Sequence, residues 1–232
     1  LSSSSAASDV YKRQAQHRAA PGQLTNAEGH ELIDQLTSYE RPYPMLVLTG
    51  GDCFERPDLV DLIEYAVGKG LHVSISPSVT PLFTRERVKA VQDAGVSVMS
   101  MSLDGGSAET HDAFRGFPGT FDRTIEACHM LNELGMRFQL NTVFTAKNIH
   151  EAPQMLKNAI DLGAFMFYTF MLVPTGRGQH LDMLTPHERE DVLHWLHDNS
   201  TRIAIKTTEA PQYRRIAFPV SYTHLRAHET GR

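Results

Sequence analysis

The chain has 232 residues, of which 41% are hydrophobic and 21% charged, enough apolar material for one domain with a full core. Its formal net charge of −5 gives no reason to expect nucleic acid or an anionic membrane as a partner. No apolar run reaches membrane-spanning length, and the two cysteines, Cys53 and Cys128, indicate neither a disulfide framework nor a zinc site. We expect a cytoplasmic domain.

The two ends of the chain differ in character from its middle. Residues 1–14 and 220–232 resemble translated sequencing-library adapters. One set of codons for Asp9 to Gln14 encodes Val220 to His224 when it is reverse-complemented and read in a shifted frame. Two unrelated natural tails would rarely be related in this way. We therefore expect residues 1–14 to be a disordered adapter-derived scar, residues 220–232 to be a second scar, and residues 15–219 to be a truncated core domain. The alternative is a serine-rich tail and an unrelated basic tail.

Helices and strands alternate along this core. Capping residues and apolar residues at helical spacing predict helices over residues 25–39, 57–68, 84–94, 121–134, 151–162 and 185–198. Short apolar or alternating runs predict strands over residues 45–48, 71–76, 96–103, 136–143, 164–172 and 202–206. A loop is expected between the third strand and the helix at 121. This alternation predicts an α/β fold with a parallel sheet, and its repeat of roughly 25–35 residues is typical of a barrel.

Small or polar residues follow the predicted strands. They are Gly50, Gly51 and Asp52, then Ser76 and Ser78, then Ser102 and Asp104, then Asn141, and finally Val173 with the proline after it. Ligands of such folds bind at the carboxyl ends of the strands, so we expect a binding site there.

The types of these residues suggest a ligand. The carbonyls of Gly50 and Gly51 with Asp52 could hold an ammonium group, and Arg115 could hold a carboxylate at two points. Ser102 and Asp104 suit the vicinal hydroxyls of a ribose. Together these groups describe an amino acid joined to a nucleoside. Each residue alone is more often a cap or a solvated charge.

The same residues carry a resemblance to a known family. Thr49-Gly50-Gly51-Asp52 resembles the GGE-type motif of radical S-adenosylmethionine (radical SAM) enzymes, and residues 101–105 with 110–122 resemble the fourth-strand region of that superfamily. Residues 172–178 and 206–215 resemble the haem-biosynthesis subgroup of the branch that carries a SPASM domain, which also includes pyrroloquinoline-quinone-synthesis enzymes. The resemblance implies a partial (β/α)6 TIM-like barrel from which the first strand and the cluster loop are missing.

The resemblance also implies roles for the strand-end residues in binding S-adenosylmethionine. Gly50, Gly51 and Asp52 would bind the amino group, Ser76 with Ser78 and Arg115 the carboxylate, Ser102 and Asp104 the ribose, and Asn141 with the backbone of Val173 the ribose or adenine. Asp52 stands where glutamate is commoner and Cys53 where proline is usual. The CxxxCxxC loop that would hold a [4Fe–4S] cluster has no counterpart, because no cysteine precedes Cys53.

By this resemblance the intact parent would use the cluster and S-adenosylmethionine to form a 5′-deoxyadenosyl radical. The radical would take hydrogen from a tetrapyrrole or a peptide. An electron donor such as flavodoxin or ferredoxin would reduce the cluster. The fragment itself would be inactive. Two alternatives stay open. One is a (β/α)8 enzyme acting on a phosphorylated metabolite, with residues 175–178 as its phosphate loop, and the other is a non-catalytic nucleoside-binding module.

Some residues have simpler interpretations. Cys53 is expected to be a small loop residue and Cys128 a core residue of its helix. The aromatic residues of the predicted fifth strand are expected to serve in packing rather than to form a base-stacking platform; they are Phe165, Phe167, Tyr168 and Phe170.

Overall fold

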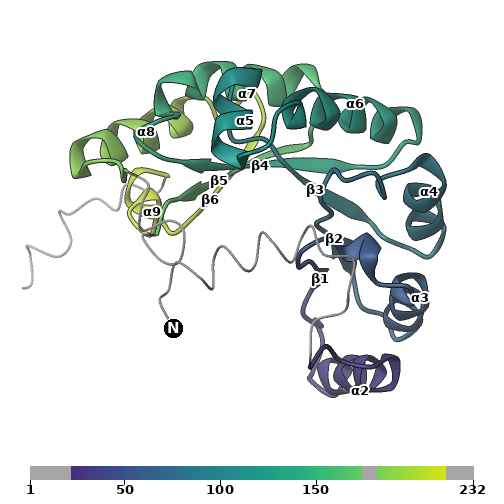
Figure 1. Ribbon diagram of the computed structural model, residues 1–232. Coiled ribbons are helices and arrows are strands. Elements are labelled where there is room, and N and C mark those ends of the chain that lie inside the picture. The colour runs from purple at the N-terminus through teal and green to yellow at the C-terminus, as the bar shows by residue number, and fades with distance from the viewer. Residues whose placement is uncertain (1–21, 174–181, 218–232) are drawn as a thin grey trace, which may run out of the picture.

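The computed structural model describes residues 22–173 and 182–217. A six-stranded sheet forms its centre, and its strands lie in chain order. They are β1 (Leu46–Leu48), β2 (Val73–Ile75), β3 (Val98–Ser102), β4 (Phe138–Phe144), β5 (Met166–Met171) and β6 (Ala204–Thr208). Every neighbouring pair is parallel. The sheet curves but does not close, since β1 and β6 lie at its opposite ends (Figure 1).

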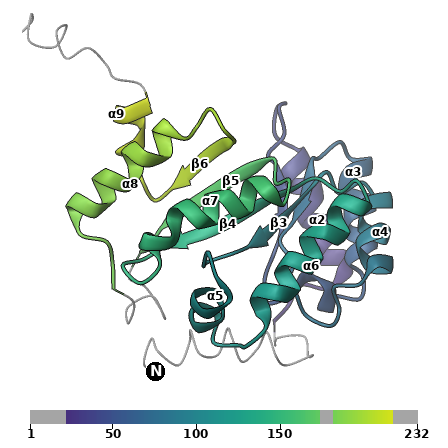
Figure 2. The same cartoon turned by 90° about the horizontal axis from the view of Figure 1, so that it is seen from above.

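Helices cover one side of the curved sheet (Figure 1). They are α2 (Asn26–Thr37), α3 (Leu59–Gly68), α4 (Arg85–Asp93), α6 (Thr120–Glu133), α7 (Ala152–Asp161) and α8 (Pro186–Asp198). Seen from above, α7 lies over β4 and β5, with α6 beside it (Figure 2). Such helix-covered parallel strands are the architecture that the alternating pattern predicts. Within the described ranges, no helix has the length and apolar character that a bilayer span requires.

Local sequence explains where these helices begin. Thr25 and Thr185 each form a reciprocal capping box with the glutamate three residues on, and the hydroxyl of Thr84 accepts a hydrogen bond from the Arg87 amide. These caps satisfy amide groups that have no partner inside the helix. The six predicted helices and six predicted strands are all confirmed, with ends that differ by a few residues.

The prediction of an uninterrupted loop between β3 and α6 is wrong. This segment contains α5 (Ala108–Arg115), which Ser107 caps and Gly116 ends in a left-handed conformation with φ 76°. The helix is short and buries one residue, His111, so it has no apolar stripe for a periodicity argument to detect. The short helix α9 (Tyr213–Ala217) was likewise not predicted. The 3-10 turns η1 (Cys53–Glu55) and η2 (Ile149–Glu151) precede α3 and α7.

Burial alternates along β4 and β5, and this divides the sheet into two faces. Leu140, Phe144 and Phe167 are at most 1% exposed, as expected of side chains on the face that the helices cover. Their neighbours Asn141 and Tyr168 are half-buried on the opposite face, because successive side chains of a strand point to opposite sides. Cys128 of α6 is fully buried, so its prediction as a core residue is confirmed.

Candidate functional site

The chain leaves β1 through two glycines. Gly50 has φ 144°, which a residue with a side chain rarely adopts, and a Cβ there would meet no atom within 4 Å. The carbonyl oxygen of Gly51 accepts a hydrogen bond of 2.7 Å from the hydroxyl of Ser78, which follows β2. The exits of β1 and β2 are therefore joined directly, with open space above Gly50.

Asp52 follows these glycines and is only 5% exposed. Its Oδ1 accepts from the amide of Phe54 at 3.1 Å, and its Oδ2 accepts from the hydroxyl of Thr80 at 2.6 Å. An ionised carboxylate has about four acceptor positions, so each oxygen keeps a lone pair for another donor. The carboxylate is thus held in one orientation at the strand end. No sequence pattern points to Thr80, because its contact with Asp52 joins residues that are far apart in the chain.

Asp104 follows β3 and is 2% exposed. Its Oδ1 accepts from the amide of Val143 at 2.8 Å, and its Oδ2 forms an ion pair of 2.7 Å with Nη2 of Arg115. The structure therefore brings together two residues that were predicted to hold different parts of a ligand. The Arg115 side chain is 28% exposed and reaches the carboxylate from the last turn of α5.

His111 of α5 lies beneath this ion pair and is fully buried. Its Nδ1 accepts a hydrogen bond of 2.9 Å from the amide of Asp104. Burial lowers the pKa of His111 to about 4, although the nearby Asp104 carboxylate opposes the shift. The ring is therefore neutral at pH 7, and with Nδ1 accepting, the proton resides on Nε2. His111 positions Asp104, a role that sequence reasoning did not assign.

The loop from Asp104 to Ser107 is clamped by residues that precede α7. Glu151 accepts from the Gly106 amide at 2.7 Å and from the Ser107 hydroxyl at 2.9 Å. Asn148 donates from Nδ2 to the Asp104 carbonyl at 3.0 Å. Sequence reasoning missed both clamping residues, although an asparagine between a strand and a helix is a recognisable turn signal.

The remaining predicted site residues lie along the same edge or on the face without helices. Ser102 and Asn141 are register partners on β3 and β4, and Asn141 Oδ1 accepts from Gln139 Nε2 at 2.9 Å. The Ser76 hydroxyl approaches the Ser100 carbonyl at 3.5 Å. Val173 is 43% exposed. Residues 174–178, which include the phosphate-loop alternative, lie outside the described residues, as do the two predicted scars.

The described residues do not provide a metal centre. No group of three or more histidine, cysteine, aspartate or glutamate side chains within residues 22–173 and 182–217 is arranged to hold an ion. Cys53 and Cys128 are both buried, and burial raises the pKa of each thiol to about 12. Both thiols are therefore protonated at neutral pH.

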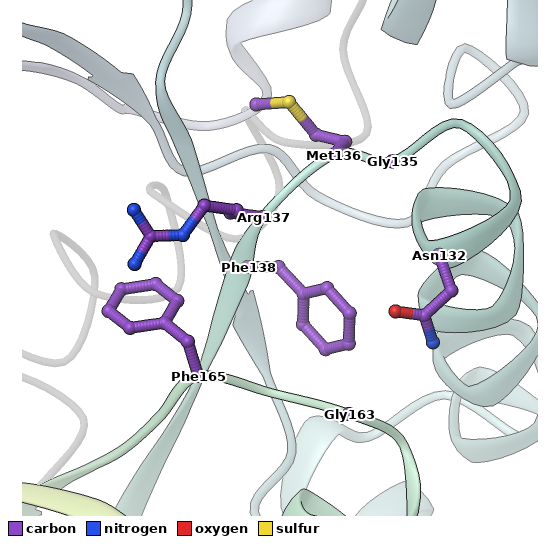
Figure 3. Close-up of a pocket in the computed structure, with 7 residues that line it drawn as sticks. All are labelled: Asn132, Gly135, Met136, Arg137, Phe138, Gly163 and Phe165. Atoms are coloured by element: carbon purple, nitrogen blue, oxygen red, sulfur yellow. The ribbon is translucent and has the colours of Figure 1, made fainter.

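A small pocket lies at the opposite edge of the sheet, near the amino ends of β4 and β5. Figure 3 shows the Arg137 side chain beside the Phe165 ring, with the guanidinium carbon 4.6 Å from the ring centroid. The pocket is lined by Asn132, Gly135, Met136, Arg137, Phe138, Gly163 and Phe165. Because ligands of parallel α/β sheets bind at the carboxyl ends, this pocket is separate from the candidate site.

Comparisons with known proteins agree with the geometry. The family model described as "Radical SAM superfamily" matches residues 13–159. An AdoMet-dependent heme synthase of Methanosarcina barkeri is 39% identical over 210 residues, which are 89% of this chain and 59% of the relative. A second AdoMet-dependent heme synthase, from Oleidesulfovibrio alaskensis, is 41% identical over 200 residues, 84% of this chain and 51% of the relative. The chain therefore spans between half and three-fifths of these relatives.

A solved structure shows the same fold. The crystal structure of Streptococcus suis SuiB bound to S-adenosylmethionine aligns with a TM-score of 0.67 at 12% identity, covering 90% of this chain and 49% of SuiB. At this identity the likeness concerns the fold alone. The predicted TIM-like architecture is thereby confirmed, as an open parallel sheet.

Proposed function

The chain belongs to the radical SAM superfamily, and from that premise we propose that the carboxyl edge of its sheet binds S-adenosylmethionine. The observation that carries the proposal is the placement of two oriented, buried carboxylates, Asp52 and Asp104, on the exits of β1 and β3. One β-strand lies between them, so the two exits are about 10 Å apart. Family membership favours this function over a phosphorylated-metabolite enzyme and over a non-catalytic nucleoside module.

The amino end of the ligand would lie over β1. Gly50 leaves open space, and the carbonyls of Gly50 and Gly51 with the Asp52 carboxylate would accept the three N–H bonds of an ammonium group. Asp52 is already fixed by Phe54 and Thr80, so its oxygens need no reorganisation on binding. Ser76 and Ser78, which follow β2 next to this exit, would meet the carboxylate of the ligand.

The ribose would lie at the exits of β3 and β4. Asp104 and Ser102 would bind the two hydroxyls, with Asn141 and the backbone of Val173 nearer the ribose or adenine. Arg115 would move its guanidinium from Asp104 to the ligand carboxylate, an exchange that keeps the charge paired while freeing Asp104 Oδ2 for a hydroxyl. His111 and the Val143 amide would keep Asp104 in place during this exchange.

The iron–sulfur cluster does not fit the residues of this chain. A cluster with one open iron needs three thiolates, and the chain has two cysteines, both buried. We therefore assign no step in this chain to a cluster, and we propose that the chain as printed is inactive. In the intact parent, S-adenosylmethionine would supply a 5′-deoxyadenosyl radical for hydrogen abstraction, with electrons from a carrier such as flavodoxin or ferredoxin.

Similarity to heme synthases favours a tetrapyrrole over a peptide as the substrate of the intact parent. We propose that residues 1–14 and 220–232 are adapter scars around a truncated core at residues 15–219. In that case the cysteine ligands of the cluster should be encoded upstream of the core. Sequencing the genomic DNA before codon 15 tests this directly. A CxxxCxxC motif closely upstream is the expected result, and an uninterrupted natural start near residue 15 would contradict the proposal.

A further inference from the structure

A row of side chains crosses the helix-free face of the sheet at the level of the proposed ribose site. Ser102 on β3 is the register partner of Asn141 on β4, Asn141 is that of Tyr168 on β5, and Tyr168 is that of Lys206 on β6. Register partners in a parallel sheet project to the same face. The four side chains therefore line one continuous surface.

The β6 end of this row is separated from the nucleoside site. Lys206 lies two strands beyond Asn141, which is about 10 Å at the usual spacing of strands. A nucleoside held by Ser102, Asp104 and Asn141 would leave the surface at Tyr168 and Lys206 available to a second molecule. This second position lies on the same concave face, where a substrate must come to react with a bound cofactor.

The second position combines an aromatic surface with a cation. The rings of Tyr168 and Phe170 lie 4.4 Å apart between centroids, at 34°. Hydrogen bonding between the Tyr168 hydroxyl and Thr208 at 2.5 Å fixes the ring. The Lys206 ammonium lies 4.7 Å from the Tyr168 ring centroid, and in residues 22–173 and 182–217 it has no carboxylate partner. Phe167 of the same strand is 1% exposed and packs in the core, whereas Tyr168 and Phe170 are half-buried and pack against each other.

We propose that Lys206 binds a carboxylate of the substrate while the Tyr168–Phe170 surface packs against its planar ring system. This inference rests on the proposed function, because it places a tetrapyrrole substrate beside bound S-adenosylmethionine. Tetrapyrroles present carboxylates at the rim of a flat aromatic macrocycle, and the Lys206 ammonium and the two rings match both features in chemistry. Lys206 is a substrate-binding residue in this account, and Thr208 positions the Tyr168 ring.

The test is a titration of the full chain with coproporphyrin III, a tetracarboxylate tetrapyrrole, followed by porphyrin absorbance. Lys206→Met should weaken binding about tenfold, the effect of losing a hydrogen bond to a charged group, while Lys206→Arg should restore most of the affinity. Lys157→Met is the matched control, since Lys157 is an exposed lysine of α7 on the opposite side of the sheet. Added potassium chloride should weaken porphyrin binding less in Lys206→Met than in the wild type.

Calorimetric titration of the same variants with S-adenosylmethionine separates this inference from the proposed function. S-adenosylmethionine affinity should be unchanged in Lys206→Met. Equal porphyrin affinity of Lys206→Met and the wild type would overturn the inference. So would a loss of S-adenosylmethionine affinity in Lys206→Met as large as its loss of porphyrin affinity. Lys206-dependent binding of an acidic peptide in place of the porphyrin would also overturn it. Wild-type chain that binds S-adenosylmethionine but no porphyrin would refute the inference alone, and chain that binds neither would refute both.

Discussion

Replacing Gly105 with alanine should disturb the candidate site more than any change of side-chain chemistry at that loop. A Cβ on Gly105 would lie 2.4 Å from the amide nitrogen of His111 and 2.8 Å from its Cα. Carbon atoms in contact normally stay about 3.5–4.0 Å apart, so the first turn of α5 would have to move by roughly 1 Å. That movement would pull His111 away from the Asp104 amide, with which it makes a bond of 2.9 Å, and Arg115 away from the Asp104 carboxylate.

The magnitude follows from the kind of atom that must move. Overpacking lowers the free energy of unfolding by about 1–3 kcal/mol. Gly105→Ala should lie at the upper end of this range, because the atoms that the new Cβ meets are backbone atoms and cannot rotate away. For a domain of this size each kcal/mol lowers the melting temperature by about 2–4 °C, so we expect a fall of about 6–12 °C. Gly68→Ala is the matched control, because Gly68 ends α3, is exposed, and a Cβ there meets nothing within 4 Å.

Thermal unfolding followed by circular dichroism measures both variants. Gly68→Ala should melt at or slightly above the wild-type temperature, since alanine is the better helix former by up to about 1 kcal/mol. Gly105→Ala should also bind S-adenosylmethionine more weakly. Identical melting of Gly105→Ala and the wild type would refute the close approach of this loop to α5.

Three further predictions concern charge and thiols. Asp104→Asn should weaken S-adenosylmethionine binding by about tenfold or more in calorimetry, because a charged acceptor is lost, while Asp161→Asn on the exposed face of α7 should not; equal affinities would contradict the role of Asp104. His111 has a folded-state pKa of about 4 against an ordinary 6.5, so the unfolded chain takes up the proton first. Urea unfolding should therefore show stability that is complete above pH 6.5 and falls by up to about 3 kcal/mol toward pH 4, with a shallower fall in His111→Asn; parallel curves would count against the buried neutral ring. Anaerobic reconstitution with iron and sulfide should yield no stoichiometric cluster absorbance, because Cys53 and Cys128 are the only thiols and both are buried. Appearance of that absorbance would contradict the conclusion that the chain lacks a set of cluster ligands.

The sequence predicted the fold well because the local signals were strong. The helices predicted to start at residues 25, 84 and 185 do begin there, and the threonine at each of these positions forms a capping hydrogen bond. Short apolar or alternating runs located β4 and β5 to within a few residues. Helix α5 was missed because eight mostly polar residues with one buried histidine carry no periodic signal.

The strand-end location of the candidate residues could be predicted from the sequence, but their contacts could not. The rule that ligands bind at the carboxyl ends of parallel strands singles out Asp52 and Asp104, and the structure has them at the exits of β1 and β3. The ion pair between Asp104 and Arg115 could not be foreseen, because it depends on an unpredicted helix bringing Arg115 back over β3. The clamps from Asn148 and Glu151 likewise join residues more than forty positions apart, a separation at which sequence spacing carries no information.

We propose that the strand exits of this chain hold S-adenosylmethionine through its amino acid and its ribose. The decisive measurement is isothermal titration calorimetry of the chain with S-adenosylmethionine, repeated with Asp52→Asn. We expect one-to-one binding that weakens about tenfold in Asp52→Asn and is unchanged in Gly68→Ala. Absence of binding to the wild type, or equal affinity of wild type and Asp52→Asn, would contradict it.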